Sequence, residues 1–185
     1  MMIRFIDVCI ASFFIIGFLP IYLIVYFSLL FFTKKPVFCQ VRLGVNRIPF
    51  VLYKFRTMKE STLNVPTHLV SKRSLNKIGG FLRQFKLDEI PQFVNVLKGD
   101  MSIVGPRPCL PIQEDIIIER SYRNVFSIRP GITGISQING IDMSTPIPLA
   151  ETDKLYIIDY GLKIYFKILL FTFFGSGFGD RITRN

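Results

Sequence analysis

Tryptophan is absent from this sequence of 185 residues, and histidine and cysteine are scarce, with one and three residues respectively. Cys9, Cys39 and Cys109 are widely spaced and form no CxxC pair, so they predict neither a disulfide framework nor a zinc site. His68 lies in a polar stretch in which no neighbouring residue would complete a metal site. These shortages exclude scaffolds held together by disulfides or zinc, and they suit a reducing compartment.

Acidic residues are also in short supply, because 13 Asp and Glu stand against 23 Lys and Arg and leave a formal net charge of +10. Such an excess predicts an anionic partner: nucleic acid, an acidic membrane face or a phosphorylated substrate. The sequence has no zinc-finger spacing, recognition-helix pattern or RNP-like aromatic strand, so we expect no nucleic acid. Half of the residues are hydrophobic and 19 are Phe, with the excess at the two ends, which favours lipid and phosphate.

The N-terminal region contains a long uncharged run, residues 8–32, which exceeds the roughly 18 apolar residues that indicate a membrane helix. Pro20, in the middle of the run, predicts a kink because it removes a backbone hydrogen bond. Basic residues flank both ends, Arg4 before the run and Lys34 and Lys35 after it, so the positive-inside rule favours a helix that enters, bends and returns. The alternatives are a kinked single span and a buried core helix of a soluble protein.

The remaining length is enough for one domain, so we expect a re-entrant membrane helix in residues 1–35 and a cytosolic domain in residues 36–185. Alternation at residues 50–55 predicts a strand. Residues 60–74 are polar and predict a surface loop, whereas the spacing in residues 111–126 is helical.

A second apolar run lies at residues 162–174, with Lys163 and Lys167 four residues apart on one helical face. The run is short for a membrane span, which favours an interfacial amphipathic helix, and a core helix of the domain is the alternative. The fold class that follows is α+β, mainly α, with a membrane helix at the N-terminus and interfacial helices.

The stretch KLDEIPQFVNVLKGDMSIVGPRP, residues 86–108, contains two adjacent carboxylates, Asp88 and Glu89, which we call the dyad. Because proline is tolerated in the first turn of a helix, Pro91 predicts a helix that begins at the dyad, with Asp88 as its N-cap, and ends before Gly99. Neighbouring residues on a helix do not face each other, so the two carboxylates suit two roles. One would hold Mg²⁺ and the other would attack phosphorus. The alternative is that the pair only caps the helix.

Cations on rigid loops accompany the dyad in the sequence. Arg107 lies between two prolines that restrict its backbone, and its planar guanidinium matches the oxygens of a diphosphate. Arg129, followed by proline and glycine, repeats this arrangement ahead of a polar, glycine-punctuated run, and Arg42 is a further cation. The candidate phosphate- and substrate-binding residues are Lys54, Arg56, Arg83, Arg107, Arg129, Gln137 and Asn139. With the dyad, they predict a site that handles phosphate.

Several sequence blocks resemble the bacterial sugar transferases, specifically the small monotopic phosphoglycosyl transferases that start glycan assembly on a lipid. The blocks are RFID (residues 4–7), QVRLG (40–44), KFRTM (54–58), LDEIPQFVNVLKGDMSIVGPRP (87–108), RPGITGISQING (129–140) and ETDKLY (151–156). They extend along almost the whole chain.

The resemblance implies transfer of a sugar-1-phosphate from a UDP-sugar, expected to be an N-acetylated amino sugar, to undecaprenyl phosphate, with release of UMP. It implies that Asp88 is the nucleophile of a covalent phosphosugar-aspartate intermediate, that Glu89 coordinates Mg²⁺ and that Arg83 and Arg107 contact phosphate. It also implies a re-entrant helix in the bacterial cytoplasmic membrane and a catalytic domain on the cytoplasmic face. The pathway would build a surface glycan such as O-antigen or exopolysaccharide, and the hydrophobic helix could support a homodimer.

The sequence departs from the family pattern at Leu19, where serine usually precedes the membrane proline, at Ile141, where arginine is frequent, and at Tyr165, where aspartate is common. The arginine missing at Ile141 favours a second hypothesis, a catalytically inactive membrane-bound scaffold that binds lipid phosphate. A third hypothesis is a phosphatase that cleaves lipid diphosphates. The intact dyad favours the transferase.

Overall fold

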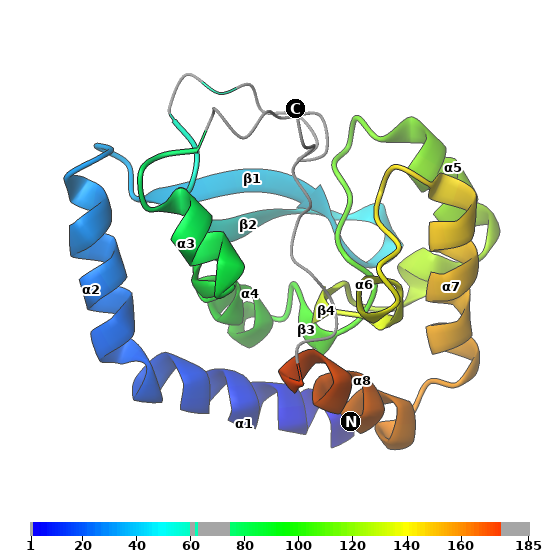
Figure 1. Ribbon diagram of the computed structural model, residues 1–185. Coiled ribbons are helices and arrows are strands. Elements are labelled where there is room, and N and C mark those ends of the chain that lie inside the picture. Colours follow the sequence, from blue (N-terminus) through cyan, green and yellow to red (C-terminus); the bar gives the residue numbers. More distant parts are fainter. Residues whose placement is uncertain (1, 60–61, 63–74, 175–185) are drawn as a thin grey trace.

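The computed structural model describes residues 2–59, 62 and 75–174, and Figure 1 shows their arrangement. The described part is mainly helical, with two small two-stranded sheets, which confirms the expected α+β class. The surface loop expected at residues 60–74 lies, apart from Thr62, outside the described residues.

The N-terminal segment forms two helices, α1 (Met2–Gly17) and α2 (Leu19–Leu30), whose axes differ by 61°. The break lies at Phe18, and Pro20 occupies the first turn of α2, where its missing N–H costs nothing. The expected kink is therefore present, but Pro20 lies in the first turn of the second helix and does not interrupt a continuous one. Within the described residues, no single helix has the length and apolarity to cross a membrane, whereas this bent pair has them jointly.

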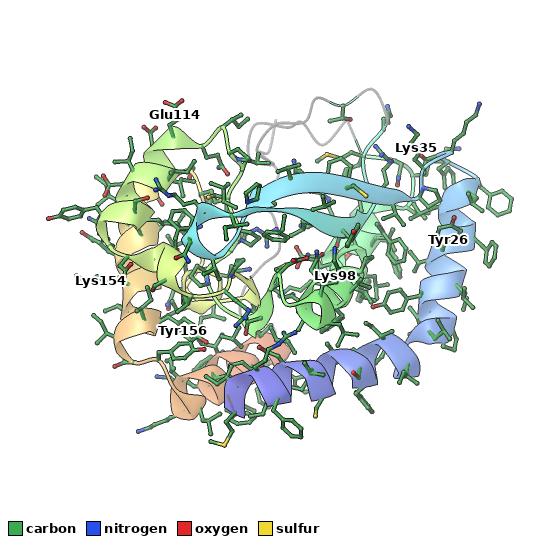
Figure 2. The ribbon with its side chains drawn as sticks, turned by 180° about the vertical axis from the view of Figure 1, so that it is seen from behind. Tyr26, Lys35, Lys98, Glu114, Lys154 and Tyr156 are labelled. Carbon is green, nitrogen blue, oxygen red and sulfur yellow. The ribbon has the colours of Figure 1, made fainter. Side chains whose placement is uncertain are left out.

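The bent pair of helices packs on the domain along one side and leaves its other side exposed (Figures 1 and 2). Ala11 of α1 is buried in the main core, and the ring of Phe14 stacks on Phe93 at a centroid distance of 4.9 Å. In contrast, Phe13 is 67% exposed and Ile24 is 66% exposed. This exposure rules out the alternative of a fully buried core helix.

A β-hairpin follows the helix pair. Strand β1 (Val37–Leu43) pairs antiparallel with β2 (Pro49–Phe55), and the register runs from Val37 opposite Phe55 to Leu43 opposite Pro49. The turn between them, η1 (Val45–Arg47), requires positive φ at Asn46, a residue type that tolerates this conformation. The strand expected at residues 50–55 is thus confirmed.

The dyad lies between two short helices, α3 (Gly79–Gln84) and α4 (Gln92–Lys98), in a 3₁₀ turn, η4 (Leu87–Glu89). Gly99 ends α4 with φ of 91°, as expected for a helix stop. The expectation that Asp88 is the N-cap of this helix is wrong, because α4 begins at Gln92 after Pro91 and Asp88 is inside the preceding turn.

The second half of the domain alternates short strands with helices. Its elements are β3 (Ser102–Val104), α5 (Glu114–Tyr122), η5 (Val125–Ser127), β4 (Gly131–Thr133), α6 (Ile135–Ile138), α7 (Pro146–Ile158) and α8 (Leu162–Phe173). Strands β3 and β4 pair in parallel at the centre, and α5 and α7 lie together on the flank opposite α2 (Figure 1). The helix expected in residues 111–126 is confirmed as α5.

Helix α8 has features of both structures expected for the C-terminal apolar run, an interfacial helix and a core helix of the domain. Tyr165 and Ile168 are fully buried in the main core, whereas Leu170 and Phe173 are 58% and 85% exposed. In Figure 1 the helix lies beside the N-terminal part of α1, so the exposed apolar residues of α1 and α8 belong to neighbouring elements. One face of α8 is therefore a core face and the other is unpartnered within the described chain.

Candidate active site

The dyad is held in a tightly specified turn. Lys86, which precedes the turn η4, adopts a left-handed conformation with φ of 55°, which is unusual for a residue other than glycine. Leu87 packs into a core cluster, and Ile90 on the other side of the dyad is buried. Asp88 is 6% exposed. The backbone on both sides therefore fixes where the two carboxylates lie.

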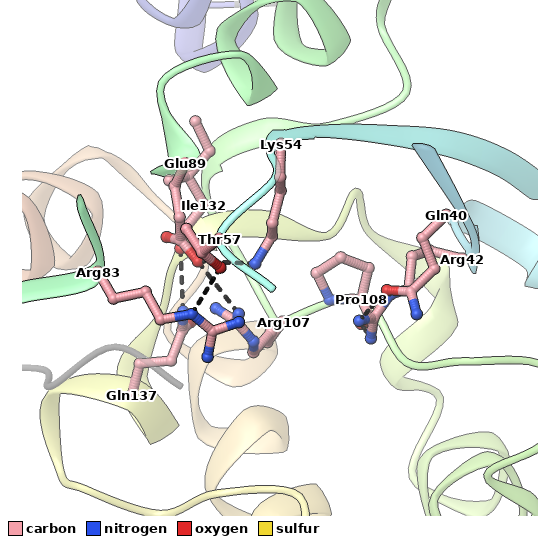
Figure 3. Close-up of polar contacts among 10 residues, drawn as sticks. All are labelled: Gln40, Arg42, Lys54, Thr57, Arg83, Glu89, Arg107, Pro108, Ile132 and Gln137. Carbon is pink, nitrogen blue, oxygen red and sulfur yellow. Dashed lines mark hydrogen bonds and ion pairs between the residues drawn. The ribbon is translucent and has the colours of Figure 1, made fainter. Parts of the chain in front are cut away.

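Two cations from separate elements converge on Glu89 (Figure 3). Lys54 Nζ, from β2, lies 2.9 Å from Glu89 Oε1, and Arg107 NH2, from the loop after β3, lies 3.1 Å from the same oxygen. The three side chains are only 11–16% exposed. These two positive charges formally balance the two carboxylates of the dyad, so a further cation at this corner gives it a net positive charge that suits an additional anion.

Lys86 adds a third cation that the sequence analysis did not identify. Burial lowers the pKa of its ammonium group, and the charge of Arg107 lowers the pKa further, whereas the charge of Glu89 raises it. Lys86 therefore interacts electrostatically with both Glu89 and Arg107. The signal in the sequence was its position two residues before Asp88 in KLDE, where positive charge would act on either carboxylate.

Arg83 is anchored from the side of α3. Its Nε donates to Thr57 Oγ1 at 2.8 Å, and Thr57 is itself 4% exposed (Figure 3). The NH1 atom of Arg83 is buried and has no hydrogen-bond partner among the described residues. A buried guanidinium nitrogen without a partner is costly, so this atom is suited to a group that binds there.

The other expected binding residues lie in different surroundings. Arg129 Nε donates to Gly99 O at 2.9 Å, at the C-terminal end of α4, whereas the dyad precedes the N-terminal end. Arg56 Nε donates to Lys35 O at 2.8 Å, near the junction with α2. The structure therefore unites Lys54 and Arg107 with the dyad and assigns Arg129 and Arg56 contacts elsewhere.

The two candidate binding residues of the glycine-punctuated run, Gln137 and Asn139, bind backbone groups of their own segment. Gln137 Nε2 donates to Ile132 O at 2.9 Å, and its Oε1 is buried without a partner among the described residues. Asn139 Nδ2 donates to Ile135 O at 2.9 Å and is exposed. Figure 3 draws Gln137 in the same close-up as Arg83 and Arg107, whereas Asn139 closes the end of α6.

The dyad offers the ligands of a Mg²⁺ site in which the protein supplies only part of the coordination shell. The described residues contain no group of three or more His, Cys, Asp or Glu side chains that would form a complete protein cage. Mg²⁺, however, is usually held by one or two carboxylates and completes its shell with substrate phosphates and water. Asp88 and Glu89 supply that number of carboxylates, so the dyad fits a Mg²⁺ ion that arrives with a phosphorylated substrate.

Comparison with known proteins bears on this arrangement. Residues 1–177 match the family described as bacterial sugar transferase. The chain is 40% identical over 139 residues to the Bacillus subtilis protein named uncharacterized sugar transferase EpsL. The matched residues cover 75% of this chain and 68% of that protein.

Two similar proteins have a named activity, UDP-glucose:undecaprenyl-phosphate glucose-1-phosphate transferase. The Klebsiella pneumoniae protein is 34% identical over 183 residues, which cover 91% of this chain and 38% of its own length. The Escherichia coli (strain K12) protein is 36% identical over 159 residues, which cover 78% of this chain and 33% of its own length. The chain thus spans well under half of these two relatives.

Proposed function

The chain belongs to the bacterial sugar transferase family, and on this premise we propose that it transfers a sugar-1-phosphate from a UDP-sugar to undecaprenyl phosphate and releases UMP. The observation that carries the proposal is the convergence of Lys54 and Arg107 on Glu89 beside the nearly buried Asp88. Plain helix capping does not explain it, because the dyad lies outside α4.

In the first step, a carboxylate oxygen of Asp88 forms a bond to the sugar-bearing phosphorus of the UDP-sugar. The bond from that phosphorus to the bridging oxygen breaks, and UMP leaves with the electron pair. Arg107, Lys54 and Lys86 supply positive charge at the place where negative charge develops on the leaving group. Glu89 would hold Mg²⁺, which supplies further charge neutralisation for the phosphate oxygens when bound.

In the second step, a phosphate oxygen of undecaprenyl phosphate attacks the same phosphorus, and the Asp88 carboxylate leaves unchanged. Dividing the exchange into two displacements lets both anionic substrates use one cationic site in turn. Arg83 NH1, buried without a partner in the described chain, is the group suited to bind a phosphate oxygen in either step.

The lipid substrate requires a membrane, and the apolar surface supports that environment. Exposed Phe5 and Phe13 on α1, Phe27 on α2 and Phe173 on α8 are 56–85% accessible, far more than a solvated surface usually carries. We propose that the α1–α2 pair re-enters the cytoplasmic membrane and that α8 lies at its interface, with the domain on the cytoplasmic face. A homodimer through the N-terminal helices remains part of this proposal.

The donor sugar is the least specified element of the proposal. The N-acetylated amino sugar expected above competes with glucose, for which two relatives are named, and the pathway would be that of a surface glycan. The second candidate function, an inactive scaffold that binds lipid phosphate, has in its favour Ile141 at a position where an arginine is frequent.

The test is UMP release by detergent-purified protein with undecaprenyl phosphate, Mg²⁺ and a panel of UDP-glucose, UDP-galactose and UDP-N-acetyl sugars. We expect turnover with one donor, loss of turnover in Asp88→Asn, and retention in Asp115→Asn, an exposed aspartate on α5. Without the lipid, a covalent intermediate predicts release of at most one UMP per protein. Full turnover by Asp88→Asn would refute the assignment of the nucleophile, and binding of lipid phosphate without UMP from any donor would favour the scaffold.

A further inference from the structure

The loop that presents Arg107 is fastened through its backbone at every residue. Four successive carbonyls accept hydrogen bonds from donors on three elements, β4, α5 and β1: Pro106 O from Gly131 N (2.9 Å), Arg107 O from Arg120 NH1 (2.7 Å), Pro108 O from Arg42 NH1 (2.9 Å) and Cys109 O from Leu43 N (3.0 Å). Two of the donors are guanidinium groups. A loop held in this way has lost most of its conformational freedom before a substrate arrives.

The donor to Arg107 itself belongs to a buried ion pair. Arg120, on α5, directs Nε and NH2 to Asp153 Oδ2 of α7, at 3.0 and 2.6 Å. Ser136 Oγ donates to the other carboxylate oxygen at 2.6 Å, which fixes the rotation of the Asp153 carboxylate. The side chains of Arg120 and Asp153 are 2% and 1% exposed. The remaining guanidinium nitrogen, NH1, therefore points in a direction set by three other contacts.

A buried ion pair is a poor device for stability alone. Moving two charges out of water costs several kcal/mol per ion, and hydrophobic residues of similar volume often replace such pairs without loss. What the pair supplies is direction, because the planar guanidinium is a rigid fork. With almost no exposed surface, neither side chain can touch a substrate in this arrangement.

We propose that Arg120 and Asp153 are positioning residues for Arg107: they fix its backbone carbonyl and thereby aim its guanidinium at Glu89 and at the phosphate that binds there. The proposal rests on the proposed function for its kinetic consequence, but not for its structural one. A displacement of about 1 Å in a group that orients a reactant can cost about 10²-fold in rate.

The kinetic experiment combines variants of the pair with Arg107→Gln. Asp153→Asn leaves a buried charge and can unfold the protein, so the main variant is the double replacement Arg120→Met, Asp153→Leu, which removes both charges together. We expect kcat/KM to fall by about 10²-fold in this variant, and by less than about 3-fold when it is added to Arg107→Gln. Equal losses in both backgrounds would show that the pair acts on the fold generally and would overturn the proposal.

A matched control lies on the same two helices. Arg123, the C-cap of α5, contacts Glu151 of α7 at 3.3 Å, and the Glu151 side chain is 63% exposed. Glu151→Gln removes one carboxylate charge two residues from Asp153, and we expect it to leave kcat/KM within about 2-fold of wild type, because exposed pairs contribute little. A loss as large as that of the double replacement would also overturn the proposal.

Hydrogen–deuterium exchange of peptides covering residues 101–112 separates this proposal from the proposed function. The amides of Gly105 and Leu110 donate to Thr133 O and Gln113 Oε1, at 2.8 Å each, and report on the order of the loop. We expect faster exchange in the double replacement and unchanged exchange in Glu151→Gln, whether or not any UDP-sugar is turned over. Loosening of the loop in a protein without activity would refute the transferase alone, whereas unchanged exchange of the loop would refute the positioning role alone.

Discussion

Glu89→Gln should destabilise the protein more than removal of either cation that binds it. At 2.9 and 3.1 Å, with an effective dielectric constant of about 20, Coulomb's law gives each pair about 5–6 kcal/mol of attraction before desolvation. Desolvation offsets most of this gain, and removing one partner of a buried pair typically costs about 3–5 kcal/mol. Glu89→Gln removes the carboxylate that both Lys54 and Arg107 contact, so we expect a loss at this level.

Lys54→Met is the informative comparison, because Glu89 keeps its pair with Arg107. We expect a loss of about 1–3 kcal/mol for this variant. Glu119→Gln removes the carboxylate of α5 that binds Arg123, the C-cap of that helix, and should cost about 0–1 kcal/mol. The free energy of unfolding is measured by urea titration in detergent, without nucleotide or Mg²⁺.

The order of the three losses is the result that matters. If Glu89→Gln cost no more than Glu119→Gln, the two cations would not depend on Glu89, and the electrostatic account of the site would be refuted. The same variant separates binding from catalysis. Removing one negative charge should leave UDP binding in EDTA as tight as in wild type or tighter, while Mg²⁺-dependent turnover falls.

Two further predictions concern packing and thiol chemistry. Gly105→Ala should abolish turnover and lower stability, because a Cβ there would lie 2.4 Å from Arg129 O. Gly80→Ala in α3, with open space around it, should be neutral or stabilising by about 0.5–1 kcal/mol. Thermal unfolding and UMP release check both variants, and wild-type stability and turnover in Gly105→Ala would contradict the packing. Burial raises the pKa of the Cys109 thiol, so little thiolate exists near pH 8. Iodoacetamide should therefore modify exposed Cys39 but not Cys109 until the protein unfolds. Mass spectrometry measures the modification, and equal modification of the two thiols in the folded protein would contradict the prediction.

The sequence predicted where helices end or bend at positions occupied by glycine or proline. Gly99 ends α4 because only a residue that accepts positive φ fits there, and Pro20 marks the bend between α1 and α2 to within two residues. The N-cap expected at Asp88 failed because the left-handed Lys86 and a 3₁₀ turn place the dyad before the helix, and nothing in the sequence signals a left-handed lysine.

The site was predictable only in part, because its contacts join distant segments. Lys54 and Arg107 were identified as cations, but their convergence on one oxygen of Glu89 depends on how β2 packs beside α4. Arg129 had the same local pattern as Arg107, yet its Nε binds at the far end of α4, a helix about 10 Å long.

The Arg120–Asp153 pair was not predicted from the sequence, because it too joins distant segments. Its members are 33 residues apart on two helices, and each alone has the appearance of a surface charge. The only hint was that ETDKLY, which contains Asp153, belongs to the blocks shared with the family.

The attachment of the bent helix pair to α4 has a mechanical consequence. Tyr22 Oη donates to Ile90 O at 2.7 Å, directly after the dyad, and Arg4 NH1 donates to Val96 O at 2.7 Å near the other end of α4. The helix that follows the dyad is thus fixed at both ends to the segment proposed to enter the membrane. Bilayer thickness would then set the height of the dyad above the lipid, and turnover in bilayers of different acyl-chain length should pass through an optimum.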